Sequence, residues 1–396
     1  MRIYKIIMII LFSSILFLGG YLTLTRPDKL ISETENRVLK QAPKYSKQKL
    51  MDGSLFSEFD EYFKDQIVGR KRIILLSSKI DMAMKKTKYN DVVIGKDGYL
   101  LKFNSFYPEK TSKDIEKDTS YISKEIKDLN NHINKNKGKF LFVGIPTQSY
   151  FNSDKYIYPF NDGYQEQLHV DNSLFGKLQN YNINYIDMKN TFKNSKEQLH
   201  YKTDHHYNHK GAYLTYVDII NNLRKNGVKI KEPFTLDELK MKTIDKPFRG
   251  SWNSNLNWIY KNDDRAVIPT MKMPPYDNIV NYEKKDKIYY DKYKNYISYW
   301  VYMDGDKAEQ VIKTNRKDLP NAVIFGDSYT NAVEPLLFMH FNETRILDLR
   351  HYFDMNLYDY IEKYKPDVVI YVTSNTSYTI KDKNNDFKGK FRELNK

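Results

Sequence analysis

The chain contains no cysteine and only three tryptophans among its 396 residues. Without cysteine the fold has no disulfide bonds, and a chain of this length without them is compatible with work outside the reducing cytosol. The sequence also has no internal repeat, no His-Glu-X-X-His motif and no recognised nucleic-acid-binding motif. These absences argue against a repeat protein, against that kind of zinc site and against a nucleic-acid-binding module.

Charge and aromatic content narrow the class of protein further. Lysine and arginine number 64 against 50 aspartates and glutamates, which gives a net charge of +14, but the lysines are scattered along the chain. This balance suits an anionic membrane surface or cell-wall polymer better than nucleic acid. The 15% aromatic content, with 34 tyrosines, excludes disorder for most of the chain. The length allows one large domain or two smaller ones.

The N-terminus carries a targeting signal. An apolar run from Ile6 to Leu24 follows Arg2 and Lys5 and precedes Arg26. This pattern predicts a transmembrane helix with its N-terminus in the cytoplasm and the rest of the chain outside. Gly19-Gly20-Tyr21 is a poor cleavage site, so we favour an uncleaved single-pass anchor in the cell membrane over a signal peptide, whose cleavage would release a secreted protein.

Three residues can supply the chemistry of a serine hydrolase. Such catalysis needs a hydroxyl nucleophile, a histidine that takes its proton, and a carboxylate that orients the histidine. Asp204 precedes His206 by two residues, a spacing at which the carboxylate can bind the ring N–H within one loop. Ser328 follows an apolar strand pattern, Ala322–Phe325, and precedes a helical pattern over 333–341. We predict that Asp204, His206 and Ser328 form a catalytic triad.

Two short motifs resemble a known family. Gly326-Asp327-Ser328 resembles the first block of SGNH-type esterases, and Asp204-His205-His206-Tyr207 is similar to the Asp-His-His-Trp signature of the DHHW proteins. Those proteins are relatives of the alginate O-acetyltransferase family, in which the acid–histidine block also precedes the serine. The segments 56–66 and 93–100 are similar to the family's opening segments, so the resemblance covers roughly residues 50–380. Tyr207 departs from the usual tryptophan but keeps an aromatic ring.

The resemblance also suggests residues that stabilise the oxyanion. The predicted strand Pro366–Val372 ends in Thr373-Ser374-Asn375, which resembles the block in which SGNH enzymes offer an asparagine amide. Asn375 is therefore the candidate oxyanion donor, and an asparagine that caps the turn after the strand is the alternative. Arg350 could add positive charge near the same site, or it could be solvated or held in a salt bridge.

A metal site is the rival interpretation of the histidine loop. Asp204, His205, His206 and His209 lie within six residues and could together bind zinc. The triad explains Ser328 as well, so we predict no cofactor and no metal, and we expect His205 and His209 to pack within the loop.

The remaining pattern predicts an α/β fold with an SGNH-hydrolase-like, mostly parallel sheet and helices on both faces. The segment Lys139–Pro146 has a buried-strand pattern that ends in a Gly/Pro loop. Thr147–Tyr150 would then lie at the carboxyl edge of this strand, where open α/β sheets bind ligands. An apolar helix face runs from Ala212 to Leu223, before a stop signal at Asn226-Gly227. The predicted domains are an anchor or signal (1–26), a linker and helical neck (27–90), the first part of the catalytic domain (91–232), a β-rich aromatic insertion (233–315) and the second catalytic part (316–396).

All three tryptophans, Trp252, Trp258 and Trp300, fall inside the predicted insertion. Their flat faces suit the apolar faces of sugar rings, so they are candidate substrate-binding residues. The alternative is that they form the small core of the insertion itself, because tryptophan is usually largely buried.

These observations predict a membrane-anchored, extracytoplasmic serine O-acyltransferase that moves an acetyl group onto hydroxyls of a cell-surface or secreted polysaccharide. Ser328 would carry the acyl group, His206 would act as base and then acid, and Asp204 would orient His206. The resemblance implies a multi-spanning membrane O-acyltransferase as the partner that supplies the acyl group. An acetyl-esterase with the same triad and a non-catalytic glycan-binding or assembly protein on the same scaffold remain alternatives.

Overall fold

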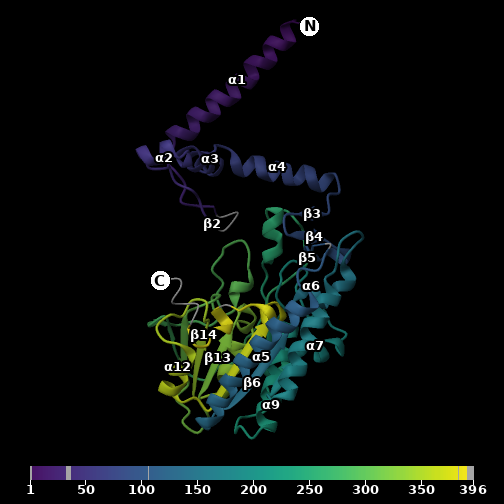
Figure 1. The fold of residues 1–396 in the computed structure, drawn as a ribbon, viewed down its shortest axis with the longest axis vertical. Helices are drawn as coiled ribbons and strands as arrows, with labels where there is room; N and C mark the ends of the chain where they lie inside the picture. Colours follow the sequence, from purple (N-terminus) through teal and green to yellow (C-terminus); the bar gives the residue numbers. More distant parts are fainter. Residues whose placement is uncertain (1, 33–36, 106, 382, 390–396) are drawn as a thin grey trace. The chain divides into compact units, whose positions relative to one another are not determined.

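The computed structural model describes residues 2–32, 37–105, 107–381 and 383–389 (Figure 1). It divides into two compact units. The N-terminal unit comprises Met1–Tyr89 and Asn253–Lys261, and the sheet unit comprises Asn90–Trp252 and Asn262–Lys396.

The N-terminal unit is helical. Its first helix, α1 (Arg2–Thr25), is apolar and exposed, and the stretch Ile3–Thr25 is long enough to cross a membrane. The predicted apolar helix is therefore present near the N-terminus, as an anchor or a signal would require. The other elements are β1 (Ile31–Ser32), β2 (Arg37–Val38), α2 (Lys47–Met51), α3 (Ser54–Gln66), α4 (Arg70–Ala83) and β3 (Lys88–Tyr89). Within the segment predicted as a linker and helical neck, α3 and α4 are separated at Gly69, a residue with a φ of 78°.

The sheet unit is built on an eight-stranded mixed sheet in the order β11-β10-β12-β14-β13-β15-β6-β7. Neighbouring strands from β14 to β7 run parallel, whereas β12, β10 and β11 extend the sheet antiparallel. The strands are β6 (Lys139–Ile145), β7 (Tyr185–Asp187), β10 (Asp277–Val280), β11 (Glu283–Lys285), β12 (Glu309–Lys313), β13 (Ala322–Gly326), β14 (Glu343–Leu347) and β15 (Val368–Ser374). The predicted α/β fold is confirmed, and the sheet is mixed.

Helices cover both faces of this sheet (Figure 1). Successive side chains of a strand point to opposite faces of the sheet. On β6, Leu141 and Val143 pack with α9 on one face, and Phe140 and Phe142 pack with α5 and α7 on the other. The helices are α5 (Ser112–Lys135), α6 (Gln148–Phe151), α7 (Tyr164–Asn180), α8 (Met188–Lys193), α9 (His209–Lys225), α10 (Leu236–Leu239), α11 (Glu334–Leu337) and α12 (Leu357–Tyr364). With both faces covered, the ends of the strands are left to form a site.

Short elements complete the sheet unit. Two antiparallel pairs are formed by β4 (Val92–Ile94) with β5 (Leu100–Lys102) and by β8 (Met241–Thr243) with β9 (Val267–Pro269). The 3₁₀ turns are η1 (Lys96–Gly98), η2 (Ser153–Lys155), η3 (Ser251–Leu256), η4 (Tyr299–Val301), η5 (Ser328–Thr330), η6 (Phe338–His340), η7 (Asn375–Thr379) and η8 (Lys383–Asn385). The helix expected over 333–341 is thus one turn of α-helix, α11, followed by η6.

The segment 233–315, predicted as a β-rich insertion, forms one two-stranded sheet of its own, β8 with β9, and also contributes strands to the main sheet. Its strands β10, β11 and β12 continue the main sheet, because β12 pairs with β14 in the register Val311↔Arg345. Val311 and Ile312 are buried, so β12 adds to the core of the sheet unit. Within the same segment, residues 253–261 belong to the N-terminal unit.

Candidate active site

Three loops of the sheet unit meet at the carboxyl edge of the parallel strands. Ser328 follows β13, Asn375 follows β15, and Thr147 follows β6. These strands are parallel neighbours in the order β13-β15-β6, so the residues that follow them lie along one edge of the sheet. The histidine loop, residues 200–207, leads into α9 and reaches the same edge through contacts with the Ser328 loop.

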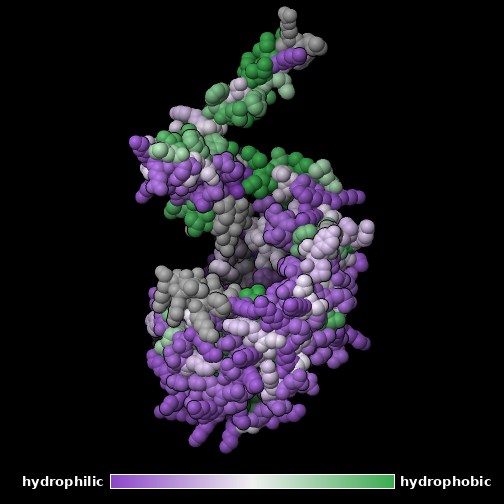
Figure 2. All heavy atoms as spheres, in the orientation of Figure 1, coloured by the Kyte–Doolittle hydropathy of each residue, from purple (hydrophilic) through white to green (hydrophobic). Residues whose placement is uncertain are grey.

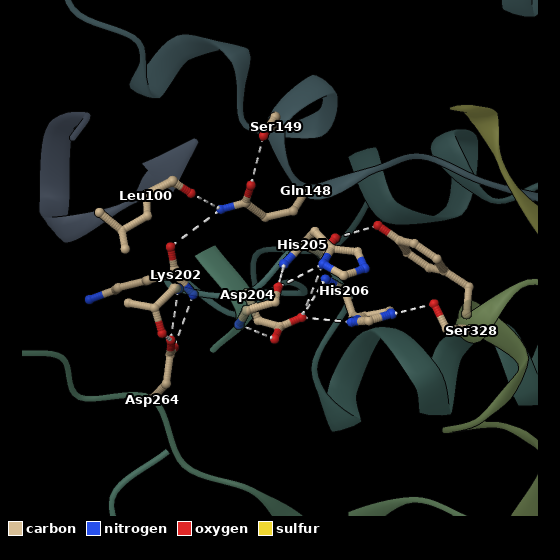
Figure 3. Close-up of polar contacts among 12 residues, drawn as sticks. Leu100, Gln148, Ser149, Lys202, Asp204, His205, His206, Asp264 and Ser328 are labelled. Atoms are coloured by element: carbon tan, nitrogen blue, oxygen red, sulfur yellow. Dashed lines mark hydrogen bonds and ion pairs between the residues drawn. The ribbon is translucent and has the colours of Figure 1, made fainter. Parts of the chain in front are cut away.

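Asp204, His206 and Ser328 form a continuous chain of hydrogen bonds (Figure 3). His206 Nδ1 lies 2.6 Å from Asp204 Oδ1, and His206 Nε2 lies 2.7 Å from Ser328 Oγ. Asp204 and His206 are buried, whereas Ser328 is half-buried. Ser328 is thus more exposed than the two residues behind it, which is the arrangement a nucleophile requires.

Asp204 is held as a carboxylate by its surroundings. Its Oδ1 also accepts the backbone N–H of His206 at 3.0 Å, and its Oδ2 accepts that of Ser251 at 2.7 Å. Burial by itself raises the pKa of Asp204, but the positive charge and hydrogen bond of His206, with the N–H of Ser251, hold that pKa well below its usual range. Ser251 also binds His205, since its hydroxyl lies 2.7 Å from His205 Nδ1.

The plane of the His206 ring is fixed by an aromatic neighbour. Tyr299 stacks on His206 with a centroid separation of 3.7 Å and an interplanar angle of 1°, and Tyr329 lies 5.0 Å away at a tilt. Sequence reasoning missed both Tyr299 and Ser251. They come from distant segments, and no local periodicity marks them.

Tyrosine hydroxyls tie the histidine loop to the serine loop. Tyr207 donates to the backbone oxygen of Tyr329, and Tyr329 donates to that of His205. Tyr207 is fully buried, so its hydroxyl has no access to water and depends on this partner. The tyrosine that departs from the family's tryptophan therefore still packs between the two loops.

The serine loop is shaped by the two residues before Ser328. A Cβ atom at Gly326 would lie 1.7 Å from the backbone oxygen of Val372 on β15, so only glycine fits there. Asp327 Oδ2 accepts the N–H and hydroxyl of Ser374, both at 2.8 Å, and Oδ1 accepts the N–H of Tyr329 at 3.0 Å. Asp327 thus fastens the turn that carries Ser328 to the end of β15.

Asn375 and Arg350 differ in how they are bound. The side-chain oxygen of Asn375 accepts the N–H of Thr147 at 3.1 Å, while its buried Nδ2 has no hydrogen-bond partner within the described part of the chain. Arg350 donates to Asp348 at 2.9 Å and to Asp306 at 2.8 Å. The charge of Arg350 is therefore balanced by two carboxylates, whereas Asn375 keeps an unused donor.

The three tryptophans have different surroundings. Trp252 is half-buried, and its ring lies 5.6 Å from that of His205, so it borders the triad. Trp300 is exposed and covers Gly305, where a Cβ atom would come within 3.4 Å of the ring. Trp258 belongs to the N-terminal unit. The backbone N–H of Trp252 also donates to the backbone oxygen of Thr203 in the histidine loop.

The residues of the histidine loop fit a metal ion poorly. Ligand atoms of Asp204, His205 and His206 lie within 4.8 Å of one another. However, both ring nitrogens of His206 are engaged, one by Asp204 and one by Ser328. His209 begins α9 and lines a separate cavity of about 880 Å³. A metal bound here would have to displace Ser328 or Asp204 from His206.

Part of the sheet unit is similar to a known family of domains. Residues 92–252 match the model of a family described as an SGNH hydrolase-like domain, acetyltransferase AlgX. This match includes Asp204 and His206 and ends before Ser328. No curated protein matches the chain. The resemblance predicted from the sequence is confirmed: residues 92–252 are similar to an SGNH hydrolase-like acetyltransferase domain.

Solved structures share the fold. Bacillus cereus PatB1 with a sulfonyl adduct is similar with a TM-score of 0.61 and 23% identity, over 76% of this chain and 99% of that one. A DHHW family protein from Eubacterium siraeum is similar with a TM-score of 0.55 and 23% identity, over 74% of this chain and 93% of that one.

Proposed function

We propose that this chain is an O-acyltransferase that uses Ser328 to move an acetyl group onto hydroxyls of a cell-surface or secreted polysaccharide. The observation that carries the proposal is the hydrogen-bond chain from Asp204 through His206 to Ser328, with distances of 2.6 and 2.7 Å. The acetyltransferase-like domain supports the choice of acyl group.

The proposed reaction has two halves. Ser328 Oγ attacks the acetyl carbonyl of the donor, its proton passes to His206 Nε2, and the departing group takes that proton. A sugar hydroxyl then attacks the acetyl ester on Ser328 and gives its proton to His206, which returns it to Ser328. Asp204 holds the Nδ1 proton throughout and stabilises the imidazolium form of His206 in both halves.

Two groups are proposed to stabilise the oxyanion. The backbone N–H of Ser328 lies at the head of η5, and the Nδ2 group of Asn375 follows the neighbouring strand β15. Asn375 suits this role because its oxygen is held by Thr147 while its amide nitrogen is unpaired within the described residues. Donors fixed in advance stabilise developing charge without reorganisation.

The acyl group must be delivered from outside the chain. We propose that α1 anchors the protein in the cell membrane with the sheet unit on the outer side, where cytoplasmic acetyl-CoA is not accessible. A multi-spanning membrane O-acyltransferase that passes the group outward would supply it. The length and apolar composition of Ile3–Thr25 support the anchor.

The test is acetyl transfer in solution. The chain is incubated with p-nitrophenyl acetate and a panel of neutral, N-acetylated and uronic-acid oligosaccharides, alongside Ser328→Ala and His206→Ala. Exposed residues provide matched controls, Ser120→Ala and His351→Ala. We expect acetylated oligosaccharide from the wild type and both controls, and none from the site variants.

The other outcomes separate the alternative functions. Release of acetate that needs Ser328, without acetylation of any oligosaccharide, would identify an esterase. Oligosaccharide binding that survives in Ser328→Ala, without acetate release or transfer in any variant, would favour the glycan-binding protein and overturn the triad.

A further inference from the structure

Helix α4 exposes an apolar stripe that the N-terminal unit does not use for packing. Ile73, Leu76 and Ile80 of α4 are 60, 59 and 50% exposed, and Met84, which caps the end of the helix, is 68% exposed. Their spacing of three to four residues places them on one side of the helix. The opposite side contains the buried Ser78, whose hydroxyl accepts a hydrogen bond from Asn257 in the same unit at 2.8 Å. The stripe therefore lies opposite the side of α4 that packs within the N-terminal unit. Figure 2 shows hydrophobic residues along α4.

Positive charge borders this stripe. Arg72 and Lys79 are exposed and lie on one flank of it, about 100° and 120° around the helix from Ile73 at 100° per residue. The single acidic residue of α4, Asp81, is paired with Lys86 at 2.7 Å. A helix with an apolar face and basic residues along its edge is typical of binding to the surface of an anionic membrane.

The start of α4 is tied to the end of the membrane helix. Thr23, near the end of α1, accepts the backbone N–H of Val68 at 3.0 Å, and Arg26 donates to the backbone oxygen of Gln66. Thr23 is fully buried by this contact. If α1 spans the bilayer, its last turn lies at the boundary with water, and these bonds hold the turn before Arg70 at the same level.

We propose that α4 lies in the plane of the membrane surface, with the stripe of Ile73, Leu76, Ile80 and Met84 among the lipid chains and Arg72 and Lys79 at anionic headgroups. This inference rests on the proposed anchoring by α1. In this proposal part of the predicted helical neck lies along the membrane surface. A lipid surface is favoured over a protein because the turn before α4 is bonded to the end of the membrane helix and the stripe is bordered by cations.

The absence of cysteine provides a clean test. A single cysteine substituted into the full chain creates one site for an environment-sensitive fluorophore. The substitutions are Leu76→Cys and Ile80→Cys on the stripe, Lys79→Cys off the stripe, and Phe12→Cys in α1. The labelled proteins are reconstituted in vesicles of phosphatidylcholine and phosphatidylglycerol. Emission is then quenched separately by nitroxide-bearing lipids and by aqueous iodide. The label at Phe12 reports anchoring independently of α4.

We expect lipid quenching at positions 12, 76 and 80, and iodide quenching at position 79. Iodide quenching at 76 and 80, with lipid quenching at 12, would overturn surface docking while leaving the anchor intact. Labels at 76 and 80 that neither reagent quenches would overturn it in favour of a second copy of the chain or another protein. Iodide quenching at position 12 would refute both the anchor and the docking.

Discussion

Replacing Asp204 by asparagine tests the proposed role of the buried carboxylate. Asp204 accepts three N–H groups, from the ring and backbone of His206 and from the backbone of Ser251. An asparagine offers one oxygen, so its amide group must face either His206 or Ser251. Facing His206, it favours the tautomer with the proton on Nε2, which cannot accept the proton of Ser328.

Either orientation lowers the rate. If the asparagine oxygen faces His206 instead, the tautomer is correct but the negative charge that stabilises the imidazolium is gone. We expect kcat/KM with p-nitrophenyl acetate to fall roughly 10³–10⁴-fold in Asp204→Asn, by analogy with the loss known for the serine-protease triad. This corresponds to about 4–5.5 kcal/mol of transition-state stabilisation.

A neighbouring carboxylate supplies the matched control. Asp264 is also buried and accepts the N–H groups of Lys202 and Thr203 at 3.0 and 2.9 Å (Figure 3). Asp264→Asn creates a similar conflict between donors, without a bond to His206. We expect it to cost about 1–3 kcal/mol of stability but less than about a tenfold loss of rate. The reasoning is refuted if both variants lose rate equally, or if Asp204→Asn stays within tenfold of wild type.

Three further variants test the serine loop and the core of the sheet unit. Gly326→Ala should abolish acetylation because its Cβ would collide with the backbone oxygen of Val372. The control Gly176→Ala, where the Cβ meets open space on α7, should leave activity unchanged. Activity retained in Gly326→Ala would contradict this prediction. Asp327→Ala should lower the free energy of unfolding in urea by about 2–4 kcal/mol, because it leaves the N–H groups of Ser374 and Tyr329 unpaired. An effect no larger than that of Asp318→Ala, at an exposed position, would count against this prediction. Burial, and to a lesser extent nearby positive charge, lowers the pKa of His340 from 6.5 to about 4. The neutral His340 side chain therefore contributes fully to folding stability above pH 6.5, and this contribution is lost as the pH falls toward 4. Between pH 7 and 4.5, His340→Gln should therefore lose about 2–3 kcal/mol less unfolding free energy than wild type, and equal losses would show that His340 is not the group involved.

The parts predictable from sequence are those encoded locally. The strand before Ser328 and the apolar face of α9 each follow from a regular spacing of apolar residues. Asp204 and His206 lie two residues apart, so their contact needs no knowledge of the fold. The order of the acid–histidine block and the serine then linked the two motifs to one family.

The parts that sequence could not predict depend on contacts between distant segments. Ser251 reaches Asp204, and Tyr299 reaches His206, only after the chain has folded back on itself. Gly250 is a local sign of the contact between Ser251 and Asp204, because a Cβ atom at Gly250 would lie 2.1 Å from the backbone oxygen of Thr203. A single glycine in one sequence is too little to predict that contact. The pairing of β12 with β14 was missed for a similar reason. A strand pattern predicts a strand without naming its neighbour.

The measurement that tests the central claim most directly is the position of the acetyl group on the enzyme. The full chain is treated briefly with p-nitrophenyl acetate, quenched in acid, digested and mapped by mass spectrometry. The account predicts a single acetyl group on the peptide that contains Ser328, absent from Ser328→Ala and not accumulating in His206→Ala. An acetyl group on other residues, or one that forms equally in Ser328→Ala, would contradict it.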